Sequence, residues 1–219
     1  MRKKPVDVIL VVDKSGSLSP YTETLNSAIK QTVVALKTSE DLSGCDVYFT
    51  LVSFDNNMYK NIDFDNLNSV DASTLELKYE GGTNPAPALE YALQKSIKRY
   101  ETYKANGEPA YHPLIFFFTD GSPYPENPYL DEFKRIAAEY KDYEANNKLV
   151  IVSCGFGDKV NIDNLKLLTY DSNRVISVNK NDIEKLKKFF SKLIEATAST
   201  ATGERPDMAR FFANYNFNE

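Results

Sequence analysis

The sequence contains no tryptophan, one histidine and two cysteines among its 219 residues. Two cysteines, Cys45 and Cys154, are too few for a disulfide framework, and a chain of this length can build its core without one. The single histidine, His112, stands in no recognisable arrangement with a serine or cysteine nucleophile, so a hydrolase of that kind has no candidate centre. The scarcity of cysteine favours a reducing compartment, and we expect a cytoplasmic location.

The sequence also lacks long apolar runs and an excess of positive charge. No stretch approaches the roughly 18 consecutive apolar residues that a bilayer-spanning helix requires. The formal net charge is -5, which opposes binding modes that neutralise many nucleic-acid phosphates or anionic lipid headgroups. We therefore expect neither a nucleic acid nor a membrane as a partner.

The composition that remains is typical of a globular domain. Hydrophobic residues make up 42% of the chain and charged residues 26%, so the chain can bury a substantial core. From about residue 199 onward, periodicity is lost, and glycine, proline and asparagine mix with aromatic residues. We expect one domain over residues 1–200 and a C-terminal tail over residues 201–219, which either packs back on the domain or docks a partner.

Apolar segments of strand length alternate with segments of helical periodicity. The run from Val6 to Val12 is almost continuously aliphatic, which is typical of a parallel strand covered on both faces. Further strands are predicted at 47–54, 114–119, 149–154 and 175–178, with an edge strand near 58–64. Helices are predicted after Ser19-Pro20, after Asn84-Pro85, near 130–140 and 162–168, and from about 182. This alternation predicts an α/β fold with a mostly parallel sheet.

Three loops that follow predicted strands or precede predicted helices are rich in side-chain oxygen. Asp13, Ser15 and Ser17 follow the first strand, Thr83 precedes the second long helix, and Asp120 follows the strand at 114–119. Ligands of open α/β sheets bind outside the carboxyl ends of the strands, where these loops meet. Mg²⁺ and Mn²⁺ prefer oxygen ligands, and neutral hydroxyls leave the charge of the ion available to an incoming carboxylate. We predict a metal site that binds an acidic residue of a protein partner.

These residues resemble a known family, the von Willebrand factor A domains. Asp13, Ser15 and Ser17 match its Asp-x-Ser-x-Ser motif, Thr83 its second-loop threonine and Asp120 its third-loop aspartate, and the resemblance spans roughly residues 6–198. It implies a Rossmann-like, doubly wound sheet with helices on both faces. It also implies a metal-ion-dependent adhesion site with Mg²⁺ or Mn²⁺, a partner's Asp or Glu completing the shell, and Asp13 and Asp120 able to act through water.

Within that family the chain is most similar to small bacterial stand-alone members related to the tellurite-resistance TerY proteins. The resemblance is carried by residues 114–121 and 153–158 and by the end of the last helix, from Phe189-Phe190 through Ser199-Thr200. It implies a cytoplasmic adaptor of a stress-response system in which such domains accompany a protein kinase and a phosphatase. On this interpretation the protein is not an enzyme.

Other interpretations of the same residues remain open at this point. Asp13 and the two serines could form a loop and a helix cap. A Mg²⁺-dependent phosphohydrolase could use the same loops, although no acid or base beside the ion is identifiable, and a metal that only stabilises the fold is a third alternative. Asp55, after the second strand, could be an outer acceptor near the metal or an exposed carboxylate, and it is not among the predicted ligands.

Overall fold

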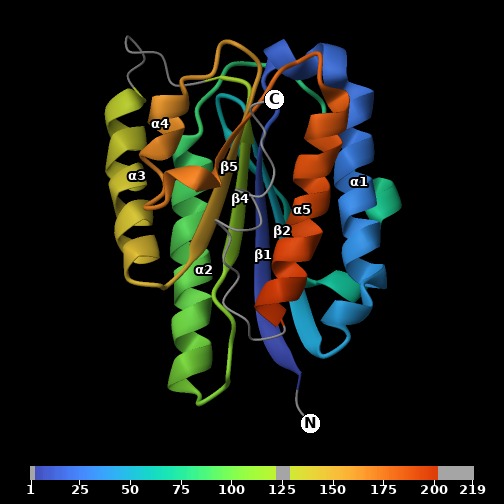
Figure 1. The fold of residues 1–219 in the computed structure, drawn as a ribbon, viewed down its shortest axis with the longest axis vertical. Helices are drawn as coiled ribbons and strands as arrows, with labels where there is room; N and C mark the ends of the chain where they lie inside the picture. Colours follow the sequence, from blue (N-terminus) through green and yellow to red (C-terminus); the bar gives the residue numbers. More distant parts are fainter. Residues whose placement is uncertain (1–2, 122–128, 202–219) are drawn as a thin grey trace.

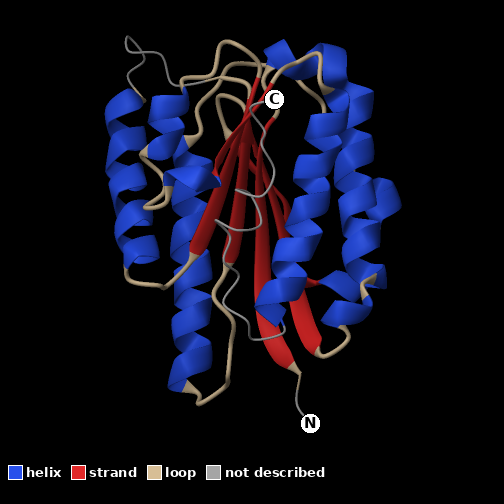
Figure 2. Cartoon of the chain, viewed as in Figure 1, coloured by secondary structure: helices blue, strands red, loops and turns tan. Residues whose placement is uncertain are grey.

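The computed structural model describes residues 3–121 and 129–201, which form a six-stranded sheet flanked by helices (Figure 2). The strand order is β3-β2-β1-β4-β5-β6, and all neighbouring strands are parallel except β2 and β3. The strands are β1 (Lys4–Asp13), β2 (Cys45–Phe54), β3 (Met58–Asn66), β4 (Leu114–Thr119), β5 (Val150–Phe156) and β6 (Val175–Val178). The predicted α/β fold with a mostly parallel sheet is confirmed.

The longer helices cover both faces of the sheet (Figure 1). They are α1 (Thr22–Thr38), α2 (Ala86–Ala105), α3 (Leu130–Ala145) and α5 (Ile183–Ala201), with the short α4 (Ile162–Lys166) beside β6. Helices α1 and α5 lie on one face, and α2 and α3 on the other. Among the described residues, no helix combines the length and the apolar composition that a membrane span requires.

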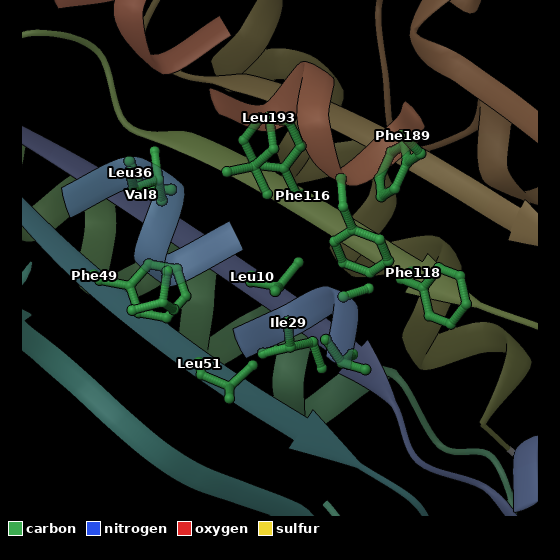
Figure 3. Close-up of a cluster of buried hydrophobic side chains, with 14 of the residues drawn as sticks. Val8, Leu10, Ile29, Leu36, Phe49, Leu51, Phe116, Phe118, Phe189 and Leu193 are labelled. Atoms are coloured by element: carbon green, nitrogen blue, oxygen red, sulfur yellow. The ribbon is translucent and has the colours of Figure 1, made fainter. Parts of the chain in front are cut away.

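The core consists of two apolar layers separated by the sheet. In β1, Val8 and Leu10 face α1 and α5, whereas Ile9 and Val11 face α2 and α3, because successive strand residues point to opposite sides. All four side chains are completely buried, which explains the unbroken aliphatic run in the sequence. Figure 3 shows part of the first layer, where Phe116 of β4 lies with residues from α1 and α5.

Several predicted boundaries differ from the observed ones by a few residues, and two of these differences concern the ends of long helices. Ser19-Pro20 does not begin the first long helix: both residues lie in a 3-10 helix over Gly16–Tyr21, and α1 begins at Thr22. Proline fits the short 3-10 segment because little regular hydrogen bonding is lost there. Helix α5 extends to Ala201, slightly past the predicted end of the domain. The predicted tail is otherwise outside the described residues.

The sheet order reverses between β1 and β4. The chain runs outward from β1 to β2 and β3, then returns to place β4 on the other side of β1, with Val12 paired to Phe118. The loops after β1 and β4 therefore leave in different directions. Such a reversal opens a crevice at the carboxyl edge of an open α/β sheet, and Asp13 and Asp120 lie at this edge.

Candidate metal centre

The loops after β1 and β4 are joined by hydrogen bonds between predicted ligands. Ser17 Oγ donates to Asp120 Oδ1 at 2.8 Å, and the hydroxyls of Ser15 and Ser17 lie 3.2 Å apart. Ser15 and Asp120 are buried, whereas Ser17 is exposed. Three of the five predicted site residues thus form one oxygen cluster, although 103 positions separate Ser17 from Asp120.

Asp13 lies at the end of β1 with both carboxylate oxygens already accepting hydrogen bonds. Oδ1 accepts from the Ser15 backbone N–H at 2.8 Å, and Oδ2 accepts from the Thr119 hydroxyl at 2.6 Å. Burial raises the pKa of Asp13 to about 6. The negative charge of Asp120 adds to this increase, whereas the two hydrogen bonds lower the pKa in part. A positive charge beside Asp13 would therefore stabilise its ionised form.

Thr83 reaches the same edge through the glycine-rich loop before α2. The Gly16 N–H donates to the Gly81 carbonyl at 3.1 Å, which ties this loop to the loop after β1. The same loop also approaches the loop after β4, since a Cβ placed on Gly121 would lie 3.6 Å from Thr83 Oγ1. The threonine hydroxyl is therefore beside the backbone that follows Asp120, and the structure brings all three predicted loops together.

Asp55 and Lys14 form a buried ion pair beside this edge. The Lys14 ammonium lies 2.7 Å from Asp55 Oδ2, and the Tyr59 hydroxyl and the Asn57 backbone N–H also donate to the Asp55 carboxylate. Burial alone would raise the pKa of Asp55, but Lys14 and these donors bring it below its ordinary value. Of the two alternatives predicted for Asp55, the exposed carboxylate is wrong, since only 4% of the residue is exposed.

Gly81 fixes the position of the loop that carries Thr83. Its φ is +81°, and an added Cβ would lie 3.1 Å from Asp55 Cβ. We expect Gly81→Ala to lower the free energy of unfolding by about 2 kcal/mol, through the unfavourable backbone conformation and the crowding of Asp55. Urea denaturation followed by circular dichroism measures this change.

The matched control for Gly81→Ala is Gly107→Ala. Gly107 also has a positive φ, +69°, but nothing lies within 4 Å of an added Cβ. In this control, only the unfavourable backbone conformation should lower the free energy of unfolding, by about 1 kcal/mol. Equal losses in the two variants would show that the contact with Asp55 does not constrain the loop.

Lys180 supplies a charge that sequence reasoning missed. It lies between β6 and α5, and its ammonium is 2.6 Å from Asp120 Oδ2. Thr119, the hydrogen-bond donor to Asp13, is also absent from the predicted site, because the sequence indicates only that it ends a strand. Its position directly before Asp120 is a local indication that could have placed it in the site.

The chemistry of this cluster suits a hard cation. Two carboxylates and three hydroxyls are oxygen donors, which Mg²⁺ and Mn²⁺ prefer over softer ligands. In the described parts of the chain, no group of three or more His, Cys, Asp or Glu side chains could hold a metal. A cation would therefore depend on the serine and threonine hydroxyls as well as on the carboxylates, and the residues present fit this requirement.

Two curated relatives match most of this chain but exceed it in length. One is an uncharacterized protein, sll0103, of Synechocystis sp., which is 26% identical over 193 residues, covering 86% of this chain and 41% of that protein. The other is the inter-alpha-trypsin inhibitor heavy chain H2 of Sus scrofa, which is 27% identical over 202 residues, covering 86% of this chain and 20% of that protein. The chain thus spans less than half of either relative.

Solved structures share the fold at low sequence identity. The vWF domain of the pilus tip protein Mfa5 from Porphyromonas gingivalis aligns with a TM-score of 0.59 at 14% identity, over 90% of this chain and 96% of that one. Proximal thread matrix protein 1 of the mussel byssus, with zinc in its MIDAS motif, aligns with a TM-score of 0.60 at 15% identity, over 87% of this chain and 48% of that one. The manganese-loaded TRAP protein of Plasmodium vivax aligns with a TM-score of 0.54 at 18% identity, over 85% of this chain and 73% of that one.

The sequence itself matches one family over most of its length. The model of the von Willebrand factor type A domain matches residues 7–196. This range includes the three loops of the oxygen cluster and every strand of the sheet except the first residues of β1. The chain belongs to the von Willebrand factor type A domain family.

Proposed function

We propose that this protein is a metal-dependent protein interaction module that binds an acidic residue of a partner through a divalent cation. The observation that carries the proposal is the oxygen cluster at the β1–β4 crevice. There the Ser17 hydroxyl donates a hydrogen bond to Asp120, and the Ser15 hydroxyl lies beside that of Ser17. Two relatives in fold are described with zinc at a MIDAS motif and with manganese, which supports a divalent ion. We propose Mg²⁺ or Mn²⁺ because the donors are all oxygen.

The proposed ligands divide into neutral and charged groups. Ser15, Ser17 and Thr83 would supply hydroxyl oxygens, and Asp120 a carboxylate. Asp13 would hold and tune the site from the end of β1, in part through water, because each of its oxygens already accepts a protein hydrogen bond. The bound ion would supply electrostatic attraction for an anionic group.

The balance of charge favours a carboxylate as the group that the site recognises. Asp13 and Asp120 together carry two negative charges when ionised, and Lys180 offsets part of the charge of Asp120. The three hydroxyls add oxygen ligands for the metal without adding negative charge. A dication would therefore keep its attraction for an Asp or Glu of a partner. A protein partner presenting such a side chain is therefore proposed.

The wider context of the module is also a proposal. The TerY-like resemblance supports a cytoplasmic adaptor in a stress-response system, with a kinase or phosphatase as the partner and no turnover at the metal. Turnover of phosphoesters by the purified protein would instead identify the Mg²⁺-dependent phosphohydrolase that the same loops could form.

Ser17→Ala tests the proposal with little risk to the fold, because Ser17 is exposed in a 3-10 helix. We expect the variant to capture at least about tenfold less partner in Mg²⁺ than the wild type, since it loses one ligand and the hydrogen bond to Asp120. The measurement is affinity capture from host extract with wild type in Mg²⁺, wild type in EDTA, and the variant, each quantified by mass spectrometry.

Ser19→Ala is the matched control, because Ser19 is exposed in the same 3-10 helix but is not a predicted ligand. It should capture the same proteins as the wild type in Mg²⁺. Addition of a short acidic peptide should release them, and its amide counterpart should not. Identical capture in Mg²⁺, in EDTA and by Ser17→Ala would contradict the proposal.

A further inference from the structure

We infer that Lys180 competes with the metal ion for Asp120 and so lowers the affinity of the site for divalent cations. The inference rests on the proposed metal site. Lys180 Nζ lies 2.6 Å from Asp120 Oδ2, and the carboxylate side chain is only 2% exposed against 27% for the lysine. A buried carboxylate depends strongly on its counter-charge, so this pairing belongs to the structure of the site.

The two oxygens of Asp120 have different partners. Oδ1 accepts from the Ser17 hydroxyl at 2.8 Å, and Oδ2 accepts from Lys180. A dication bound by Ser17 and Asp120 would lie against a carboxylate whose charge the ammonium already offsets. Because like charges repel, the ion must either displace the ammonium or bind against its repulsion. Both alternatives weaken metal binding.

Aromatic rings and a glycine position the Lys180 side chain. Its ammonium lies 5.7 Å from the Tyr21 ring centroid and 6.0 Å from that of Phe156, within the range of cation–π attraction. Gly157 has a φ of +100°, and an added Cβ would lie 2.6 Å from Lys180 Cε. The end of the 3-10 helix before α1 and the end of β5 therefore direct this lysine, which follows β6, to the residue that follows β4.

Lys14, which lies inside the Asp-x-Ser-x-Ser motif, is placed differently. Its ammonium pairs with Asp55 at 2.7 Å and faces the Tyr59 ring at 4.3 Å. The charge of Lys14 is thus offset by a carboxylate that is not a proposed ligand. Lys180, by contrast, pairs directly with a proposed ligand, and its removal should change the metal affinity.

Lys180→Met is expected to bind Mn²⁺ about tenfold more tightly than the wild type, a typical size for coupling between two bound species. In EDTA the variant should melt at a lower temperature, because Asp120 loses its counter-charge. Mn²⁺ should then raise its melting temperature more than that of the wild type. Isothermal titration with Mn²⁺ and thermal denaturation monitored by circular dichroism measure the two quantities on the full chain.

Two further variants separate charge from packing. Lys180→Arg keeps the positive charge and should show no gain in Mn²⁺ affinity. Lys187→Met makes the same substitution on α5, where Lys187 forms an exposed ion pair with Glu184 at 2.8 Å, and should leave Mn²⁺ binding unchanged.

The outcomes distinguish this inference from the proposed function. Tighter binding by Lys180→Met alone supports the competition. Equal or weaker binding by Lys180→Met, or equally tighter binding by Lys180→Arg, overturns the inference and leaves the metal site standing. If neither the wild type nor Lys180→Met binds Mn²⁺, the proposed metal site fails, and the competition fails with it.

Discussion

Asp13→Ala is expected to weaken Mn²⁺ binding by at least about a hundredfold while the domain stays folded. Loss of an outer partner of a metal ligand already reduces metal affinity about 10- to 100-fold, and Asp13 supplies negative charge to the site and orients Ser15 and Thr119 as well. Isothermal titration of the purified variant with Mn²⁺ measures the loss.

The fold should tolerate this substitution because opposing effects partly cancel. The variant leaves the Ser15 N–H and the Thr119 hydroxyl without the acceptor that Asp13 provides, which costs stability. It also removes a buried carboxylate whose pKa is raised to about 6 by that burial, so an unfavourable charge disappears at neutral pH. A circular dichroism spectrum and a cooperative thermal transition check that the variant is folded.

Asp158→Ala is the control for Asp13→Ala. Asp158 follows β5 at the same edge of the sheet and is exposed, so its loss changes the net charge of the chain equally without touching the oxygen cluster. Its Mn²⁺ affinity should stay within about twofold of the wild type, because exposed charges at a distance are screened by solvent and salt. A comparable loss in both variants would mean that general electrostatics, not the site, governs binding.

The elements that the sequence predicted well are those with local, repeated patterns. The aliphatic run of β1 and the spacing of apolar residues along α2 and α3 follow from burial on a sheet and on a helix face. Asp13, Ser15 and Ser17 were found because they lie close together after a strand. Their meeting with Asp120 was predicted from the rule that the carboxyl ends of parallel strands meet at one edge. Thr83 precedes a helix, and its place in the site was implied by the resemblance to the family.

The features that the sequence did not predict are pairs between distant residues. Lys180 and Asp120 are 60 positions apart and Thr119 and Asp13 are 106 apart, and neither pair leaves a periodic pattern in the chain. Lys180 lies in a polar segment that is typical of an exposed loop. Its role depends on the rings and the glycine around it, which only the folded chain assembles.

An ion pair between a buried carboxylate and a partly exposed arginine, far from the metal centre, yields the largest predicted effect on stability. Asp7 of β1 is 4% exposed and accepts hydrogen bonds from the Arg99 guanidinium at 3.0 and 3.1 Å. The guanidinium also stacks over the rings of Tyr48 and Phe64, at 4.8 and 4.6 Å from their centroids. Arg99→Met keeps much of the apolar packing but leaves the Asp7 carboxylate without its counter-charge.

We expect Arg99→Met to lower the free energy of unfolding at pH 7 by about 3 kcal/mol, because the buried Asp7 carboxylate is left without its counter-charge. Urea denaturation measures the loss. Arg135→Met is the control, because half-exposed Arg135 pairs with Glu90 and Glu139 on the surface, and such pairs contribute less than about 1 kcal/mol.

The dependence of this loss on pH identifies its cause. Burial raises the pKa of Asp7 above its ordinary value, against the lowering effect of Arg99, and removal of Arg99 should raise it further. A carboxyl whose pKa is higher in the folded than in the unfolded chain binds its proton more tightly when folded, so its ionisation lowers stability as the pH rises. The loss in Arg99→Met should therefore be smaller at pH 5 than at pH 7. Equal losses at both pH values would assign the effect to packing against Tyr48 and Phe64, not to the unpaired charge of Asp7.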